Sequence, residues 1–297
     1  MESGHTGLVK SVIAMHENLE AELLDIAHRA ARAAAAELMP RWRKAHQVST
    51  KSSSTDPVTE ADIAAEQAIR SLLARERPLD SILGEEGGDT AGVGVGTASS
   101  SESGAEASGL RWIVDPLDGT VNYMYGLPNF SVSVAVEDQN ETLAGVVLDP
   151  VRGEWFGATR SGAALHFPPG AGTADGEVIT GPACAQLEQA LVATGFSYQP
   201  GVRARQGAVV ARVLPRVRDI RRAGSAALDL AWAAAGHLDC YYERGVKAWD
   251  IAAGALICAQ AGMAVRELAA VPAAELPSGL LVAPPILIGE LESLITD

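Results

Sequence analysis

The first eighty residues show the hydrophobic pattern of two amphipathic helices. From about residue 19 to residue 38, apolar side chains recur every three or four positions, and a proline follows the run. Thr59 and Asp62 then have the spacing of a helix capping box, ahead of a second helical pattern that stops before Pro78. We therefore expect one helix over 19–38 and another that begins at Thr59.

Short apolar runs follow the second helix and predict strands. The run 81–84 is brief and ends at Glu85. Residues 87–109 are mostly Gly, Ser, Ala and Thr, which bury too little surface to offset the entropy of ordering, so we expect a mobile surface loop. Further β-like runs lie at 110–114, 130–136, 143–148 and 155–156. Turn signals between the last of these runs favour a mostly antiparallel sheet.

Beyond about residue 151 the pattern changes to alternating strands and helices. It predicts a strand over 191–194 and helices over 206–217, 225–235 and 251–261. Helices that stack on sheets in both halves imply an α/β (α+β) fold built as a layered sandwich, with the functional site between the halves. We place the N-terminal half at 1–152 and the C-terminal half at 153–297.

Composition narrows the class of protein. With 297 residues, 47% of them hydrophobic, the chain can bury a large core. It has no apolar run near the roughly 20 residues that span a bilayer, and charged residues interrupt its N-terminal stretch, so we expect a cytoplasmic protein without a membrane span. The net charge of −14 disfavours nucleic acid and anionic membranes as partners, and we interpret the short basic stretch 216–222 as a solvated face or interface element.

The cysteines give no sign of a metal site. Cys184, Cys240 and Cys258 are odd in number, lack the spacing of zinc ligands and have apolar neighbours. We therefore expect buried, reduced thiols.

Two carboxylates stand where a strand ends, in the stretch WIVDPLDGTVNY at 112–123. Asp115 and Asp118 are separated by Pro116, which favours a tight turn, and Gly119 lets the backbone approach a ligand. If the two charges lie about 5 Å apart at an effective dielectric near 20, they repel by about 3 kcal/mol. Either one of them is protonated or a cation lies between them, unless they are ordinary turn residues.

Two further carboxylates occupy similar positions. Glu85 follows a short strand and taken alone fits a surface residue, whereas Asp250 taken alone fits the N-cap of the helix predicted over 251–261. Together with Asp115 and Asp118 they form a set of hard oxygen donors. Such a set suits Mg²⁺ better than zinc or copper.

These stretches resemble the signatures of the inositol monophosphatase family. The block WIVDPLDGTVNY is similar to its first signature, and YERGVKAWDIAAG at 242–254 is similar to its second. The segments 51–62 and 84–86 match in order and spacing, so the resemblance covers the chain from about residue 19 to residue 290. The Ala-rich composition and the stretch 219–229 look most like the actinobacterial members.

The resemblance implies an α-β-α-β-α sandwich of the sugar-phosphatase type. It implies an inositol-1-monophosphatase, a Mg²⁺-dependent phosphomonoesterase that hydrolyses myo-inositol 1-phosphate or a similar polyol phosphate and forms a homodimer. Two to three Mg²⁺ ions would be bound by Glu85, Asp115, the carbonyl of Leu117, Asp118 and Asp250. The inserted 87–109 segment would leave Glu85 mobile before metal binds.

The same resemblance assigns the catalytic and substrate residues. Asp62 and Thr120, together with Glu85, form the catalytic set, although a carboxylate at position 62 would also cap its helix. Lys51 fits a solvated loop lysine nearly as well as a residue near the phosphate. The expected substrate contacts come from Asp118, Gly119, Thr120, Gly224, Ser225, Ala226 and Glu243; for Gly224, plain helix capping is an equal alternative.

Two other functions remain open. Histidinol-phosphate phosphatases resemble this chain in fold and metal site and differ in the pocket for the alcohol. A noncatalytic relative that acts as a binding or regulatory module would have lost a ligand or Thr120, and here each of these positions is filled. The departure at 165–170, where the family has an Asn-Gly turn, concerns a loop away from the predicted metal site.

Overall fold

We describe a computed structural model of the protein over residues 3–44, 48–50, 57–92 and 108–296. Lys51 and most of the predicted loop 87–109 lie outside the described residues. Within the described part of the chain, no helix is both long and apolar enough to cross a membrane.

The larger sheet has eight strands in the order β10-β9-β8-β7-β6-β5-β3-β4. Only the β3–β5 pair is parallel within this sheet, so the mostly antiparallel sheet that the sequence predicts is confirmed. The strands are β3 (Ser81–Gly84), β4 (Gly88–Thr90), β5 (Arg111–Asp118), β6 (Ser131–Glu137), β7 (Thr142–Asp149), β8 (Glu154–Thr159), β9 (Leu165–Phe167) and β10 (Glu177–Val178).

The second sheet has five strands in the order β12-β11-β13-β15-β14. Its strand β11 is parallel to both β12 and β13, and the remaining pairs are antiparallel. The strands are β11 (Leu191–Thr194), β12 (Asp219–Arg221), β13 (Cys240–Arg244), β14 (Ala264–Leu268) and β15 (Gly279–Ala283). A separate two-stranded ribbon joins β1 (Val48–Thr50) to β2 (Pro57–Thr59).

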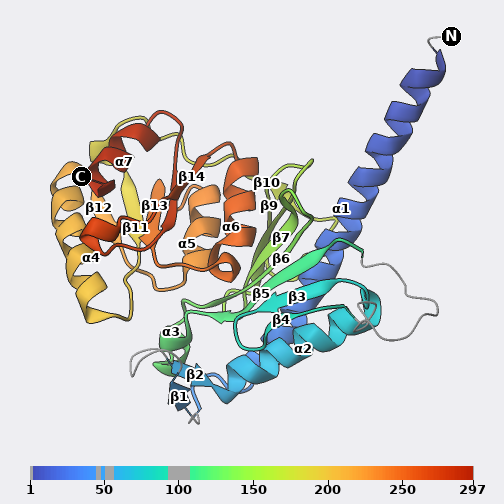
Figure 1. Ribbon diagram of the computed structural model, residues 1–297, viewed down its shortest axis with the longest axis horizontal. Coiled ribbons are helices and arrows are strands. Elements are labelled where there is room, and N and C mark those ends of the chain that lie inside the picture. Colours follow the sequence, from blue (N-terminus) through green and yellow to red (C-terminus); the bar gives the residue numbers. More distant parts are fainter. Residues whose placement is uncertain (1–2, 45–47, 51–56, 93–107, 297) are drawn as a thin grey trace.

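Helices cover both sheets and give the molecule five layers (Figure 1). One outer layer holds α1 and α2, the middle layer α5 and α6, and the other outer layer α4 and α7, so the predicted α-β-α-β-α sandwich is confirmed. The helices are α1 (Ser3–Leu38), α2 (Glu60–Glu76), α3 (Thr120–Met124), α4 (Pro200–Val213), α5 (Ala226–Ala234), α6 (Ala248–Gln260) and α7 (Ile288–Thr296).

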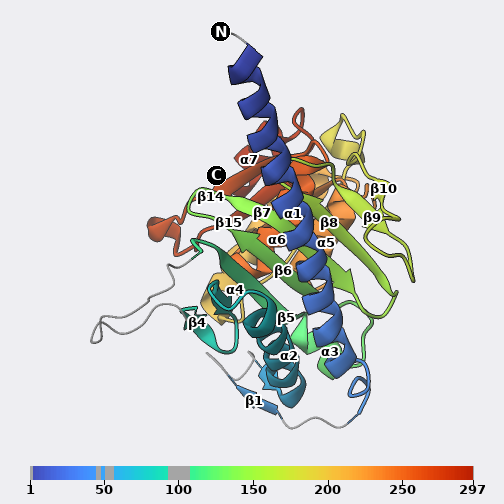
Figure 2. The ribbon, with the colours of Figure 1, turned by 90° about the vertical axis from the view of Figure 1, so that its right-hand side faces the viewer.

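Strand β5 shows how the layers arise from the sequence. Side chains alternate between the two faces of a strand, and both faces of β5 are covered. Trp112 and Val114 belong to the core between the larger sheet and α1 and α2, whereas Ile113 belongs to the core that contains α5 and α6. Figure 2 shows α1 and α2 lying side by side across the first of these faces. A continuous apolar run therefore leads into the carboxylates at the end of this strand.

Several predicted boundaries are wrong. Helix α1 begins at Ser3 rather than near residue 19, and its N-terminal turns extend beyond the body of the protein (Figure 1). Helix α4 spans Pro200–Val213 instead of 206–217, and proline occupies its first position, where the missing N–H costs nothing. Helix α6 begins at Ala248, so Asp250 lies in its first turn and is not its N-cap.

Two other expectations are corrected. The segment predicted as a loop from residue 87 forms strand β4 over Gly88–Thr90, as the second arm of a hairpin with β3. Cys184 is half-buried instead of buried, while Cys240 and Cys258 are buried, and all three are free thiols.

The division into halves at residue 152 stays a prediction. Strands β8, β9 and β10 continue the larger sheet past that point, as far as Val178. A boundary drawn by sheet membership would therefore fall between Val178 and the start of β11 at Leu191.

Candidate functional site

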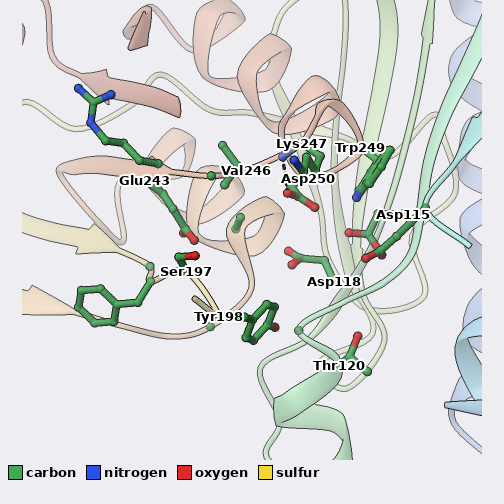
Figure 3. A pocket seen from close by; sticks show the side chains of 18 of the residues that line it. Asp115, Asp118, Thr120, Ser197, Tyr198, Glu243, Val246, Lys247, Trp249 and Asp250 are labelled. Atoms are coloured by element: carbon green, nitrogen blue, oxygen red, sulfur yellow. Dashed lines mark hydrogen bonds between the residues drawn. The ribbon is translucent and has the colours of Figure 1, made fainter. Parts of the chain in front are cut away.

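A pocket of about 420 Å³ lies where the two sheets meet, and most of the predicted site residues line it. We call one side the carboxylate wall, formed by Glu85, Asp115, Leu117, Asp118, Thr120 and Asp250. We call the other side the second-sheet wall, formed by 195–199, Arg222, Gly224, Ala226 and 243–247. Figure 3 shows the side chains of Asp115, Asp118 and Asp250 gathered on one side of the pocket and pointing toward one another, with Glu243 on the other side.

An irregularity in β5 puts two carboxylates on the same face. In a regular strand, residues three apart point to opposite faces. Here Asp115 pairs with Ser133 and Asp118 pairs with Ser131, so the register shifts between them. Those two serines are two residues apart, so they lie on the same face of β6. The two aspartates that pair with them therefore also share one face of the sheet, which is the face toward the C-terminal half. The Asp-Pro-Leu-Asp sequence thus builds a local bulge that concentrates negative charge.

Three aspartates of this wall, Asp115, Asp118 and Asp250, have raised pKa values. Burial raises the pKa of Asp115 well above its usual range, and the charges of Glu85, Asp118 and Asp250 add to the effect. Burial likewise raises the pKa of Asp118 to about 6 and the pKa of Asp250 well above its usual range. Charges that repel one another in a buried place need either protons or a cation to be stable.

Hydrogen bonds orient these side chains. Asp118 accepts bonds through Oδ2 from Ser225 Oγ and from the Ala227 N–H, both at 2.7 Å. Asp115 Oδ1 accepts a bond of 3.0 Å from the Leu117 N–H, and Asp250 Oδ2 accepts one of 2.6 Å from the Lys247 N–H.

The donor set fits a hard cation in its chemistry. Four carboxylates and the Leu117 carbonyl line one side of the pocket, and oxygen donors of this kind suit Mg²⁺. As the side chains lie, no three His, Cys, Asp or Glu residues in the described ranges close around one point.

Thr120 and Asp62 are in contact, as the sequence predicts. The Thr120 hydroxyl lies 3.1 Å from Asp62 Oδ1 and 3.2 Å from the Leu117 carbonyl oxygen. Asp62 Oδ2 accepts bonds from the N–H and the hydroxyl of Thr59, at 2.9 and 2.5 Å, and so closes the capping box of α2. Asp62 is fully buried, and it contacts the pocket residue Thr120. Asp62 therefore caps α2 and contacts Thr120 at the same time.

Close approach of the two halves requires glycine at position 119. Gly119 has φ +95°, and a Cβ there would lie 3.0 Å from the Asn129 oxygen and 3.1 Å from the Gly224 oxygen. Nearby, Asn122 Nδ2 donates to the carbonyls of Asn129 and Ala223, at 2.6 and 2.7 Å. These contacts join the two walls at the base of the pocket.

The second-sheet wall carries Glu243. The Tyr241 hydroxyl donates a 3.0 Å bond to Glu243 Oε2, and burial raises the pKa of Glu243 to about 7. A Cβ at Gly195 would overlap the Glu243 carboxylate, so this glycine makes room for it. Gly224 and Ala226 line the pocket, whereas Ser225 is buried and caps α5 through its hydroxyl.

Sequence reasoning missed part of this wall. Residues 195–199, Arg222 and Lys247 line the pocket but were not singled out. The reason is tertiary, because β11 lies parallel to both β12 and β13 and their carboxyl ends meet at one edge of the sheet, a pairing that the sequence pattern did not predict. The segments that follow these three strands all reach the pocket.

The chain is similar to known proteins over most of its length. Residues 19–295 match the inositol monophosphatase family. Inositol-1-monophosphatase of Mycobacterium leprae is 46% identical over 219 residues, which are 74% of this chain and 71% of that protein. Nus factor SuhB of Haemophilus influenzae is 38% identical over 266 residues, which are 89% of this chain and 91% of that protein.

The fold agrees with a solved structure as well. The extragenic suppressor protein suhB from Bartonella henselae superimposes with a TM-score of 0.79 at 31% identity, covering 93% of this chain and 99% of that one. The mycobacterial relative is consistent with the likeness to actinobacterial sequences. The chain therefore belongs to the inositol monophosphatase family and is an enzyme of the phosphatase class.

Proposed function

We propose that the protein is a Mg²⁺-dependent phosphomonoesterase that hydrolyses myo-inositol 1-phosphate or a similar polyol phosphate. The observation that carries the proposal is the carboxylate wall, where the bulge in β5 sets Asp115 and Asp118 beside Glu85 and Asp250 in a buried place. The relative from Mycobacterium leprae bears the name inositol-1-monophosphatase, which supports the choice of substrate.

The carboxylate wall would hold two to three Mg²⁺ ions. When bound, the ions would lower the pKa of an attacking water and stabilise the charge on the leaving alcohol oxygen. The ligands would be Glu85, Asp115, the Leu117 carbonyl, Asp118 and Asp250. Their burial strengthens the attraction for a cation, since the local dielectric is lower than that of water.

Thr120 and Asp62 would handle the proton of the water. The Thr120 hydroxyl would accept a hydrogen bond from the water while it donates to Asp62 Oδ1, 3.1 Å away. Asp62 is held by Thr59, so its orientation is set before substrate arrives. Glu85 would complete the catalytic set, and the N–H groups of Gly119 and Thr120 would bind the phosphate.

The second-sheet wall would recognise the alcohol. Glu243 would accept hydrogen bonds from vicinal hydroxyl groups, as a carboxylate can accept several at once. Gly224, Ser225 and Ala226 would shape the floor of this part of the pocket, with Asp118 between them and the metal. The substrate would therefore be a phosphate ester with a polar, uncharged alcohol.

We also propose that the protein acts in the cytoplasm as a homodimer, with the two halves of the chain at 1–152 and 153–297 as its structural units. Small phosphate esters, and neither nucleic acid nor membranes, would be its partners. The net charge of −14 supports this choice of partners.

A second candidate is a regulatory role without catalysis. The relative from Haemophilus influenzae is named Nus factor SuhB, and it aligns with nine-tenths of this chain. The carboxylates and Thr120 are all present here, which favours the enzyme. Histidinol phosphate is the alternative substrate within the enzyme class.

Phosphate release with and without Mg²⁺ tests the proposal. We expect Mg²⁺-dependent turnover of myo-inositol 1-phosphate with a higher kcat/KM than that of histidinol phosphate, fructose 1,6-bisphosphate or 3′-phosphoadenosine 5′-phosphate. A higher kcat/KM for histidinol phosphate would show that histidinol phosphate is the preferred substrate. No release from any of the four esters would favour the regulatory role.

A further inference from the structure

Glu85 stands in a hairpin turn that α2 holds directly. The turn joins β3 to β4, with Gly84 paired to Gly88 at its base. Gly88 has φ +64°, the left-handed conformation that closes a three-residue turn. On one side, the N–H of Glu85 donates to the Val114 carbonyl of β5, at 3.3 Å. The backbone before Glu85 is therefore attached to the strand that carries Asp115.

The backbone after Glu85 is attached to Glu66 of α2. The Glu66 side chain accepts a 2.7 Å bond from the Glu86 N–H through Oε2 and a 2.8 Å bond from the Gly87 N–H through Oε1. Glu66 is only 3% exposed. Because each oxygen takes a different N–H group, the carboxylate fixes both the position and the rotation of the turn.

Arg70 extends this attachment to β4. Its Nε donates to Glu66 Oε1 at 2.6 Å, and its two terminal nitrogens donate to the Gly88 carbonyl at 2.8 Å and to Thr90 Oγ at 2.7 Å. One guanidinium group thus joins the helix carboxylate to the second arm of the hairpin. Glu66 and Arg70 together therefore contact the hairpin from Glu86 to Thr90.

Two glycines let the turn fold around this pair. A Cβ at Gly84 would lie 2.6 Å from Glu66 Oε1, and a Cβ at Gly87 would lie 2.7 Å from the same atom. Any side chain at either position would push the carboxylate away from the backbone. The Gly-Glu-Glu-Gly sequence is therefore matched to the Glu66 carboxylate.

We propose that Glu66 and Arg70 are positioning residues that hold Glu85 against the pocket and thereby set the affinity of the carboxylate wall for Mg²⁺. The proposal rests on the proposed function, since it acts through Glu85 as a metal ligand. Glu66 is buried and bonded to the turn, while Arg70 is partly exposed, so the main effect of the pair falls on the geometry of Glu85. Residues that orient metal ligands typically change affinity by about 10- to 100-fold.

The test compares Glu66→Gln with the parent. Glutamine keeps the size of the side chain but turns an NH₂ group toward a backbone N–H or toward Arg70. We expect the Mg²⁺ concentration at half-maximal thermal shift, and at half-maximal phosphate release, to rise about tenfold or more, with kcat at saturating Mg²⁺ changed only a few-fold. Glu76→Gln is the matched control, because Glu76 lies on the same helix and pairs with Arg29 of α1. It should respond to Mg²⁺ as the parent does.

Gly87→Ala provides a second route that leaves both charged residues in place. Its methyl group should displace the Glu66 carboxylate and raise the same Mg²⁺ concentration, so the proposal stays testable if Glu66→Gln does not fold. Parent-like Mg²⁺ responses in folded Glu66→Gln or in Gly87→Ala, or equal shifts in Glu76→Gln, would overturn the proposal. Glu85→Gln distinguishes a failure of this proposal from a failure of the proposed function. If Glu85→Gln binds Mg²⁺ as the parent does, Glu85 is not a ligand, and that part of the proposed function fails as well.

Discussion

The two walls of the pocket differ in how firmly they are built. On the carboxylate wall, Asp115 is 1% exposed, and hydrogen bonds within the core hold Asp62 and Thr120. On the second-sheet wall, Arg222 and Lys247 are exposed, and Tyr198 is 36% exposed. The first wall takes Asp115, Leu117 and Asp118 from a buried strand, with Glu85 from the β3–β4 turn and Asp250 from α6, whereas the second follows three strand ends. The difference indicates that the metal chemistry rests on the core of the larger sheet, whereas the choice of alcohol rests on loops that other sequences can vary.

The largest effect should come from Asp115→Asn. Asparagine can still accept the bond from the Leu117 N–H, so the fold should persist. The loss of one metal ligand should remove several kcal/mol of transition-state stabilisation, which lowers kcat on the order of 10³-fold or more. Phosphate release at saturating Mg²⁺, with circular dichroism as a check on folding, measures this. Turnover within tenfold of the parent would show that the carboxylate wall does not carry the chemistry.

Thr120→Ala should rank second. It removes the hydroxyl that links the pocket to Asp62, and losing general acid–base assistance costs roughly 10²- to 10⁴-fold in kcat. Thr120→Ser is the matched control, because it keeps the hydroxyl and should retain most of the activity. If the alanine and serine variants have equal kcat values, the link to Asp62 has no catalytic role.

Glu243→Gln should act on substrate binding alone. Losing a hydrogen bond to a charged group costs about 1.5–3 kcal/mol, so KM for myo-inositol 1-phosphate should rise about tenfold or more. The Mg²⁺ concentration at half-maximal activity should stay at the parent value. The opposite result, an unchanged KM with weakened Mg²⁺ activation, would show that Glu243 acts in metal binding. The two walls would then not differ in function as proposed.

The smallest effect should come from Tyr198→Ala on the second-sheet wall. Because this side chain is partly exposed, its removal should raise KM only a few-fold and leave kcat within about twofold. Steady-state kinetics on the same ester measures both values. A loss of kcat as large as that of Thr120→Ala would show that the loop takes part in the chemistry.

Sequence patterns predicted the carboxylate wall better than the second-sheet wall. Asp115, Asp118 and Thr120 lie within one short stretch, and the capping-box spacing of Thr59 and Asp62 set the start of α2 correctly. Their relation is local, so spacing along the chain reports it. The bulge that turns both aspartates to one face depends on pairing with β6 and has no counterpart in the periodicity.

The missed features depend on contacts between distant segments. Glu66 and Arg70 have the spacing of an ordinary helical ion pair, and nothing in the pattern connects them to a turn twenty residues later. The segment 195–199 carries no charge and reaches the pocket only because β11 lies beside β12 and β13. Tertiary arrangement, and not local propensity, decides both positions.

The central claim is that the carboxylate wall binds Mg²⁺, and thermal unfolding across a Mg²⁺ titration tests it most directly. Ions that bind the folded state raise its stability, so the Tm of the parent should increase with Mg²⁺ relative to EDTA. Asp115→Asn relieves part of the repulsion among the buried carboxylates, so in EDTA it should melt at the parent temperature or above, and Mg²⁺ should raise its Tm much less. A parent protein whose Tm does not respond to Mg²⁺, or an Asp115→Asn variant with the full response, would contradict the account.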